Sequence, residues 1–180
     1  DLDNRHAAQA DQAMQAGARV HREIQKNMGP EYSAEVPLRI TEQFDDYALT
    51  IEGRADGIIQ TASEVVIDEI KGMYRDVQKL KEPVRVHLAQ AKCYAYIYGS
   101  QNDLRNIRVR ITYCNIDTEE IKYFHFEYSI KELEEWFDEV ISQYRKWADF
   151  QFQWQNLRQQ SIKNLNFPFV YRDGQKELIT

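Results

Sequence analysis

The segment SEVVIDEIKG, at residues 63–72, constrains the fold of this chain more than any other. Its apolar run, VVI, is typical of a strand in the middle of a sheet, because a continuous apolar run needs cover on both faces. Asp68, Glu69 and Lys71 follow that run almost directly. Buried charges are unfavourable unless they are paired or bind a ligand. The segment therefore predicts a central strand that ends in a polar site.

The segments before this strand predict an antiparallel meander. SAEVPLRITEQ and DYALTIEGRADGII are rich in β-branched and aromatic residues, and polar turns separate them from each other and from SEVVIDEIKG. We expect three antiparallel strands, the last of which is central. Residues 4–28 precede them with small and apolar side chains at helical spacing, which predicts a first helix.

The segments after the strand complete a mixed α/β pattern. PVRVHLAQAKCYAYIYGSQND predicts a helix with Pro83 at its start and Gly99 at its end. RNIRVRITYCN and EIKYFHFEYS predict two strands, and a long helix follows from Ile130 to about Gln160. Its apolar residues at helical spacing are expected to pack in the core: Trp136, Val140, Tyr144, Trp147 and Trp154. The order predicts a mixed β-sheet flanked by helices.

Composition limits the classes of protein that fit. The 180 residues are 43% hydrophobic, which suits one compact domain. The net charge of -6 argues against nucleic-acid binding by bulk charge and leaves a local basic groove or a bound metal ion. Cys93 and Cys114 form no CxxC pair and are expected to be buried thiols. No apolar stretch is long enough to span a membrane, so we expect a cytoplasmic protein.

The charged residues of the central strand suggest phosphodiester chemistry. Alternation along a strand places Glu69 and Lys71 on one face, and Asp68 on the other. Asp56 lies thirteen residues before Glu69 in the preceding strand, so a hairpin can bring the two acids together. Asp56, Glu69 and the backbone carbonyl of Ile70 would then hold Mg2+ or Mn2+. Lys71 would orient the attacking water or offset charge on the phosphate. A salt-bridged strand end is the structural alternative.

Three further residues are candidates for the same site. Gln90 and Tyr94 are four residues apart and share a helix face, where they can contact DNA or form ordinary helix surface. His21 lies on the apolar face of the first helix, as a hydrogen-bonded core residue or as a metal ligand. Seven basic residues are candidates for guiding a nucleic-acid strand, with solvated surface charges as the alternative: Lys79, Lys81, Arg85, Lys92, Arg105, Arg108 and Arg110.

These motifs together resemble the PD-(D/E)XK nuclease superfamily and, within it, the RecB-like exonuclease branch. That branch includes CRISPR adaptation nucleases and helicase-associated nuclease domains. Its pattern of histidine, G-x-x-D, (D/E)-x-K and Q-x-x-x-Y falls on His21, Gly53 to Asp56, Glu69 to Lys71 and Gln90 to Tyr94. The resemblance covers about residues 15–100. It implies a restriction-endonuclease-like α/β fold, with a nuclease domain over residues 1–160.

The resemblance also implies a role for each residue. His21, Asp56, Glu69 and the carbonyl of Ile70 would bind Mg2+ or Mn2+. Asp56, Glu69 and Lys71 would be catalytic. Gln90 and Tyr94 would lie on the DNA side of the site. Asp68 matches no position of the family pattern, and we expect it to be structural or to pair with a basic residue. Some relatives carry a four-cysteine iron–sulfur cluster, which this chain is not expected to have.

The last residues carry a second resemblance. FPFVYRDGQKELI, at residues 167–179, is similar to the start of XPD/DinG-type helicase domains. We therefore expect residues 161–180 to be a linker and the start of a helicase domain in a longer bacterial polypeptide. The predicted function is a metal-dependent exonuclease that acts on single-stranded DNA ends in repair or recombination. A catalytically inactive nuclease-fold module that binds DNA or a partner protein is the main alternative, and an unrelated α/β domain is another.

Overall fold

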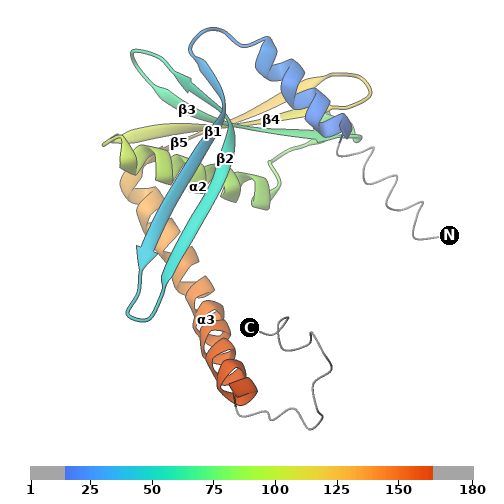
Figure 1. The fold of residues 1–180 in the computed structure, drawn as a ribbon. Coiled ribbons are helices and arrows are strands. Elements are labelled where there is room, and N and C mark those ends of the chain that lie inside the picture. Colours follow the sequence, from blue (N-terminus) through green and yellow to red (C-terminus); the bar gives the residue numbers. More distant parts are fainter. Residues whose placement is uncertain (1–14, 164–180) are drawn as a thin grey trace, which may run out of the picture. The chain divides into compact units, whose positions relative to one another are not determined.

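A computed structural model describes residues 15–163, and its core is a mixed five-stranded sheet (Figure 1). The strands are β1 (Tyr32–Gln43), β2 (Ala48–Gln60), β3 (Val65–Met73), β4 (Asn106–Asn115) and β5 (Ile121–Ser129). They lie side by side in chain order. All neighbours are antiparallel except β3 and β4, which are parallel. The predicted meander, with the third strand at the centre of the sheet, is confirmed.

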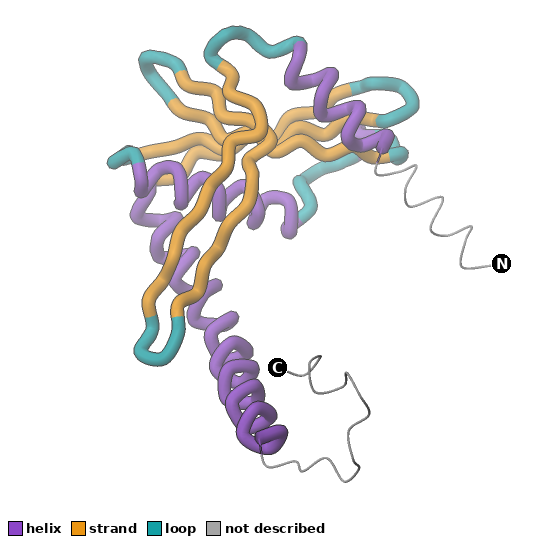
Figure 2. Tube along the Cα trace, in the orientation of Figure 1, coloured by secondary structure: helices purple, strands orange, loops and turns teal. Residues whose placement is uncertain are grey.

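Helices cover both faces of this sheet (Figure 2). The first helix, residues 15–26, precedes β1, and its predicted beginning at residues 4–14 lies outside the described residues. Helix α2 (Arg85–Gln101) makes the crossover that the parallel pair β3–β4 requires, and α3 (Ile130–Lys163) follows β5. A short 3-10 helix, η1 (Val77–Lys79), precedes α2. The predicted mixed α/β sheet flanked by helices is confirmed.

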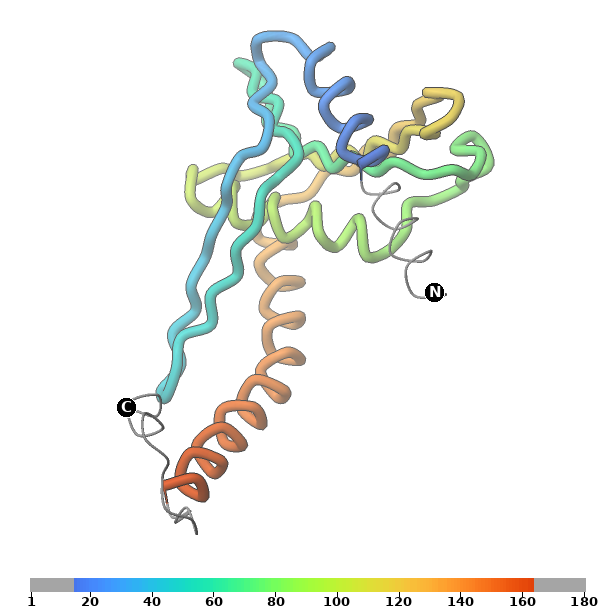
Figure 3. The backbone as a smooth tube through the Cα atoms, turned by 45° about the vertical axis from the view of Figure 1, so that its right-hand side comes forward, coloured from blue at the N-terminus to red at the C-terminus, as the bar shows by residue number. Residues whose placement is uncertain are grey.

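The two faces of the sheet have different covers. Tyr113, on β4, bonds through its hydroxyl to the backbone N–H of Val84 and to His87, so its face of the sheet meets the start of α2. Ile70 and Cys114 lie on the opposite face, where they pack against Val20 and Ile24 of the first helix. The predicted burial of Cys114 is confirmed, whereas Cys93 is only half-buried. Figure 3 follows the chain from the first helix through these layers.

Gly99 does not end the second helix as predicted. Helix α2 continues to Gln101, and Gly99 is buried in its last turn. A Cβ atom at Gly99 would overlap Cδ1 of Ile130. The glycine therefore serves close packing between two helices, which a terminator pattern in the sequence cannot distinguish from a helix end.

The expected core packing of the aromatic stripe on α3 is wrong. Val140, Tyr144, Trp147 and Trp154 are exposed, and Trp136 is half-buried. Leu133 and Phe137 are the buried residues of this helix. The chain divides after Phe137 into two compact units, Asp1–Phe137 and Asp138–Thr180. Helical spacing shows which residues share a face but does not show what covers that face.

Candidate active site

The candidate site lies where β2 and β3 stop pairing. Their ladder runs from Gln60 opposite Val65 to Gly57 opposite Asp68. The same register places Asp56 across from Glu69, one position further along. There the backbone N–H of Ile70 donates to Oδ2 of Asp56 at 2.7 Å. A carboxylate thus takes the place of a backbone acceptor, and the two acids lie on adjacent strands as the hairpin predicts.

Glu69 is a fully buried carboxylate. Its Oε1 atom lies 2.5 Å from Nζ of Lys71, an ion pair that does not have hydrogen-bond geometry. Within residues 15–163, neither carboxylate oxygen of Glu69 has a hydrogen-bond partner. Burial and the charge of Asp56 raise the pKa of Glu69 to about 7, against the opposing effect of Lys71. The lysine is a quarter exposed, so its ammonium joins the buried acid to solvent.

His21 reaches the same place from the first helix. Its Nδ1 atom lies 3.3 Å from Oδ1 of Asp56, and the imidazole is half-buried. Burial alone would lower the pKa of His21, but the hydrogen bond and charge of Asp56 raise it overall. Val20 and Ile24 anchor the helix on Ile70, so the strand that carries Glu69 also positions the histidine.

Tyr94 lies against Gly53 of β2, and Gln90 is bonded to it. The Nε2 atom of Gln90 donates to the hydroxyl of Tyr94 at 3.3 Å. A Cβ atom at Gly53 would lie only 2.6 Å from that hydroxyl, so the glycine leaves room for the tyrosine. Gly53 is three residues before Asp56 on the same strand. A glycine at this position therefore leaves the space beside β2 that the ring of Tyr94 occupies.

Asp68 is structural, as predicted, and pairs with a basic residue on β4. Arg110 donates to both of its oxygens, from Nε at 2.9 Å and Nη2 at 2.7 Å. Thr112 and Tyr32 donate to it as well, at 2.5 and 3.2 Å. The Tyr32 hydroxyl also lies 3.4 Å from the backbone carbonyl of Asp56. The network therefore supports the site from the opposite face of β3.

The strand-guiding candidates differ in how they are held. Arg110 is bound to Asp68, and Arg108 pairs with Glu64 and Glu127. Lys92 lies 4.0 Å from the ring centroid of Trp136. Arg110 is therefore part of the fold and not a free phosphate contact. Lys92 on α2 is half-buried, and both side chains of the Arg108–Glu64 pair are more than a third exposed.

Sequence reasoning missed Gln25, Glu35 and His87. Gln25 donates through Nε2 to Oε1 of Glu35 at 3.0 Å and to the backbone carbonyl of Asp56 at 2.8 Å. His87 lies three residues before Gln90 on α2, and burial and the charge of Lys71 lower its pKa. Its helical spacing from Gln90 was the one signal that could have found it. Glu35 looks like an ordinary polar position of an alternating strand.

The donor set fits a divalent cation. Asp56 and Glu69 offer hard oxygen atoms, His21 offers an imidazole nitrogen, and two oxygens of Glu69 are buried with no hydrogen bond in the described chain. A positive ion would offset the repulsion between the two carboxylates and give a partner to the Glu69 oxygen that is not paired with Lys71. The fourth predicted ligand, the carbonyl of Ile70, belongs to the residue whose N–H binds Asp56.

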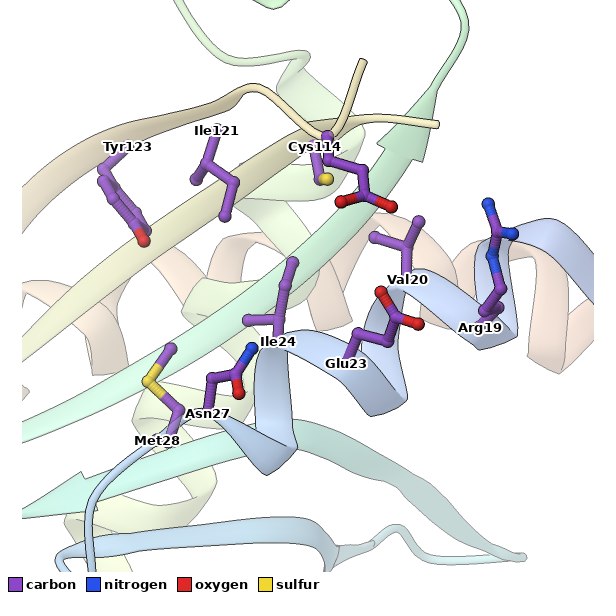
Figure 4. A pocket seen from close by; sticks show the side chains of 10 residues that line it. Arg19, Val20, Glu23, Ile24, Asn27, Met28, Cys114, Ile121 and Tyr123 are labelled. Atoms are coloured by element: carbon purple, nitrogen blue, oxygen red, sulfur yellow. The ribbon is translucent and has the colours of Figure 1, made fainter. Parts of the chain in front are cut away.

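A separate pocket of about 350 Å³ lies between the first helix and the strands β4 and β5 (Figure 4). Val20, Ile24 and Met28 line it from the helix side, and Cys114, Ile121 and Tyr123 from the strands. None of the predicted site residues lines this pocket. This pocket is therefore separate from the site of Asp56 and Glu69, which lies at the end of the β2–β3 ladder.

The metal-free protein is expected to lose stability as the pH rises from about 5 to 8. The pKa of Glu69 is about 7 when folded and 4.5 when unfolded, so the free energy of unfolding falls between these values. The full difference corresponds to about 3 kcal/mol. His21, whose pKa is also raised, contributes in the same direction. In Glu69→Gln, the free energy of unfolding should depend on pH only through His21. This variant should be more stable than the wild type at pH 8. Urea unfolding in EDTA at each pH measures this, and equal slopes would contradict it.

One of the comparisons with known proteins identifies a family for this chain. The family model described as the PD-(D/E)XK nuclease superfamily matches residues 2–159. No curated protein sequence matches the chain. Among solved structures, the crystal structure of SSO0001 is similar with a TM-score of 0.49 and 19% identity, over 66% of this chain and 56% of that one. The chain thus spans little more than half of that structure's length.

No helix in the described part of the chain is both long and apolar enough to cross a membrane.

The family match extends over all the motifs that position the acids, the lysine and the helix residues Gln90 and Tyr94. The five-stranded mixed sheet has the restriction-endonuclease-like arrangement that the motifs predict. The chain belongs to the PD-(D/E)XK nuclease superfamily.

Proposed function

We propose that this chain is a metal-dependent deoxyribonuclease that hydrolyses phosphodiester bonds from single-stranded DNA ends. The observation that carries the proposal is the buried Glu69, paired with Lys71 and facing Asp56 across the end of a β-ladder. A purely structural ion pair would not require a half-buried acid beside a fully buried one whose Oε2 atom has no hydrogen-bond partner among residues 15–163. Membership of a nuclease superfamily supports the same reading.

Each residue has a separate task in this proposal. Asp56, Glu69, His21 and the carbonyl of Ile70 would hold Mg2+ or Mn2+. When bound, the cation polarises the phosphate and lowers the pKa of a water molecule. The ammonium of Lys71, partly exposed beside Glu69, orients the attacking water and offsets the negative charge that builds on the phosphate.

Gln90 and Tyr94 of α2 are the residues expected to contact DNA. Tyr94 packs on Gly53, and Gln90 is bonded to its hydroxyl, so both lie beside the strand that carries Asp56. An amide and a phenol can donate hydrogen bonds to phosphate oxygens, and the phenol ring can stack on a base. We propose that these two residues position the strand next to the scissile phosphate.

The direct test is a cleavage assay on end-labelled single-stranded DNA with Mn2+. The wild type is expected to release short products, and Glu69→Gln is expected to lose at least a hundredfold in rate because a metal-binding charge is gone. Glu64→Gln, which alters an exposed acid paired with Arg108, is the matched control and should keep the wild-type rate. A circular single strand should resist cleavage if the enzyme requires ends. Wild-type activity in Glu69→Gln would refute the assignment.

An inactive module that binds DNA or a partner protein is the second candidate. The intact Asp56, Glu69 and Lys71 favour the enzyme. Titration calorimetry separates the two, because a module that does not cut has no need to bind Mn2+. Binding of DNA without Mn2+ binding or cleavage would favour the inactive module.

We also propose that the nuclease is one part of a larger bacterial, cytoplasmic helicase–nuclease of the RecB-like branch, active in DNA repair or recombination. This rests on the resemblance of residues 167–179 to the start of a helicase domain. Those residues lie outside the described part of the chain. Joining the nuclease to its natural downstream sequence should make cleavage of duplex DNA dependent on ATP, and ATP-independent cleavage by the longer protein would count against the proposal.

A further inference from the structure

The part of α3 that follows Phe137 has two apolar faces (Figure 1). One face carries Ile141, Ala148 and Phe152, which are half-buried. The other face carries seven large apolar side chains that are between 39 and 61% exposed: Val140, Tyr144, Trp147, Phe150, Trp154, Leu157 and Ile162. An apolar stripe of this kind is the face that a helix normally packs against another element.

The spacing of the exposed face indicates what kind of element fits it. Five of the residues occupy the two seam positions of a heptad repeat: Val140, Trp147 and Trp154 at one, and Phe150 and Leu157 at the other. Gln143 occupies the remaining seam position. A repeat of 3.5 residues keeps one face turned toward a second helix over several turns. The seam from Val140 to Leu157 therefore fits a partner helix over a length of about 27 Å.

The charges of this part of α3 are sorted from one end to the other. Its first two charged residues are the acids Asp138 and Glu139, and its last two are the bases Arg158 and Lys163. A second copy that runs antiparallel places the acidic end of each helix beside the basic end of the other, where opposite charges attract. A parallel copy sets acids beside acids and bases beside bases. The helix is therefore complementary to itself in the antiparallel orientation.

The exposed apolar area is large enough for a stable dimer. Soluble monomers rarely expose a continuous apolar patch of more than a few hundred Å². The seven side chains expose roughly 100 Å² each. Two copies would together bury roughly 1,400 Å², which lies within the range of about 1,200–2,000 Å² that is typical of specific interfaces.

We propose that this chain forms an antiparallel homodimer through the Val140–Leu157 seam of α3. In the symmetric register, Trp147 of each copy packs on Phe150 of the other, and Val140 packs on Leu157. The two-fold axis passes beside Ala148 and Asp149, so each copy contributes the same surface. This interface contains none of the candidate active-site residues, and the inference is independent of the proposed nuclease function.

Sedimentation equilibrium of the 180-residue chain, without metal or DNA, tests the dimer. The wild type is expected to have twice the 21.4 kDa mass of one chain. Trp147→Glu and Leu157→Glu each place a charge in the seam and should weaken dimerisation at least about thirtyfold. Both side chains are more than half exposed, so circular dichroism should show an intact helix. Asn156→Glu, an exposed position on the opposite side of the helix, is the matched control and should dimerise as the wild type does. A monomeric wild type, or a dimer that both seam variants leave unchanged, would overturn the inference.

Charge reversal tests the orientation of the two helices. Asp138→Lys combined with Glu139→Lys makes both ends of the helix basic, which should weaken an antiparallel dimer several-fold at low salt. Adding Arg158→Glu and Lys163→Glu to the same chain restores opposite charges at the two ends and should restore the dimer. In a parallel dimer like charges face each other before and after either change. Dimerisation that does not respond to the first pair of substitutions would therefore contradict the antiparallel arrangement.

Discussion

Lys71→Ala is expected to abolish DNA cleavage while leaving the fold intact. The ammonium lies 2.5 Å from Oε1 of Glu69 and is the partly exposed cation of the acid cluster. Removing one preorganised group that stabilises charge in a transition state typically lowers the rate by roughly 10²–10³-fold. The protein should still fold, because Glu69, whose pKa is already raised, can take up a proton when its partner is gone.

The measurement is the single-turnover rate at saturating Mn2+, with circular dichroism as the check on folding. Lys131→Ala is the matched control, since Lys131 is a highly exposed lysine that pairs with Glu135 at 4.0 Å. It should cleave DNA at the wild-type rate. If Lys71→Ala also cleaved at the wild-type rate, the lysine would have only a structural role.

Asp68→Ala is expected to lower the free energy of unfolding by several times more than a surface substitution does. Asp68 is fully buried and accepts hydrogen bonds from Arg110, Thr112 and Tyr32. Its removal leaves the guanidinium of Arg110, which is only 14% exposed, without its buried counter-charge. Breaking such a pair from one side costs about 3–5 kcal/mol.

The chain offers a matched comparison on the same strand. Arg108, two residues before Arg110 on β4, pairs with Glu64, but both side chains of that pair are more than a third exposed. Glu64→Ala should therefore lower the free energy of unfolding by no more than about 1 kcal/mol. Urea unfolding of both variants at pH 7 gives the two values. A loss for Asp68→Ala as small as that for Glu64→Ala would mean that solvent reaches Arg110 and replaces its partner.

The antiparallel order of β1, β2 and β3 and the meeting of the two acids could be predicted from the sequence. Alternation in VVIDEIKG separates Asp68 from Glu69, and the hairpin register carries Asp56 to the same end of the ladder. These are local rules that act within a strand or between consecutive strands. The partner of Asp68 was predictable only as some basic residue, because β4 joins the sheet through a crossover.

The contributions of Glu35, Gln25 and the α3 aromatics could not be predicted in the same way. Glu35 approaches the acids through a left-handed backbone in the middle of a strand, which no propensity favours for glutamate. Gln25 acts through a backbone carbonyl, so its position depends on how the first helix lies on Ile70. The aromatic residues of α3 do share one helix face, as their spacing predicts. They are exposed, because spacing alone does not show whether another element covers that face.

The attachment of the first helix has a consequence for the order in which this molecule comes apart. A small apolar cluster around Ile70 holds the helix, and polar contacts from His21 and Gln25 to Asp56 add to it. The sheet, by contrast, is joined by continuous ladders on either side of β4. Segments with few buried contacts open before the rest of a protein. The first helix would therefore detach while the sheet stays intact. His21 would then separate from Asp56 without unfolding of the sheet.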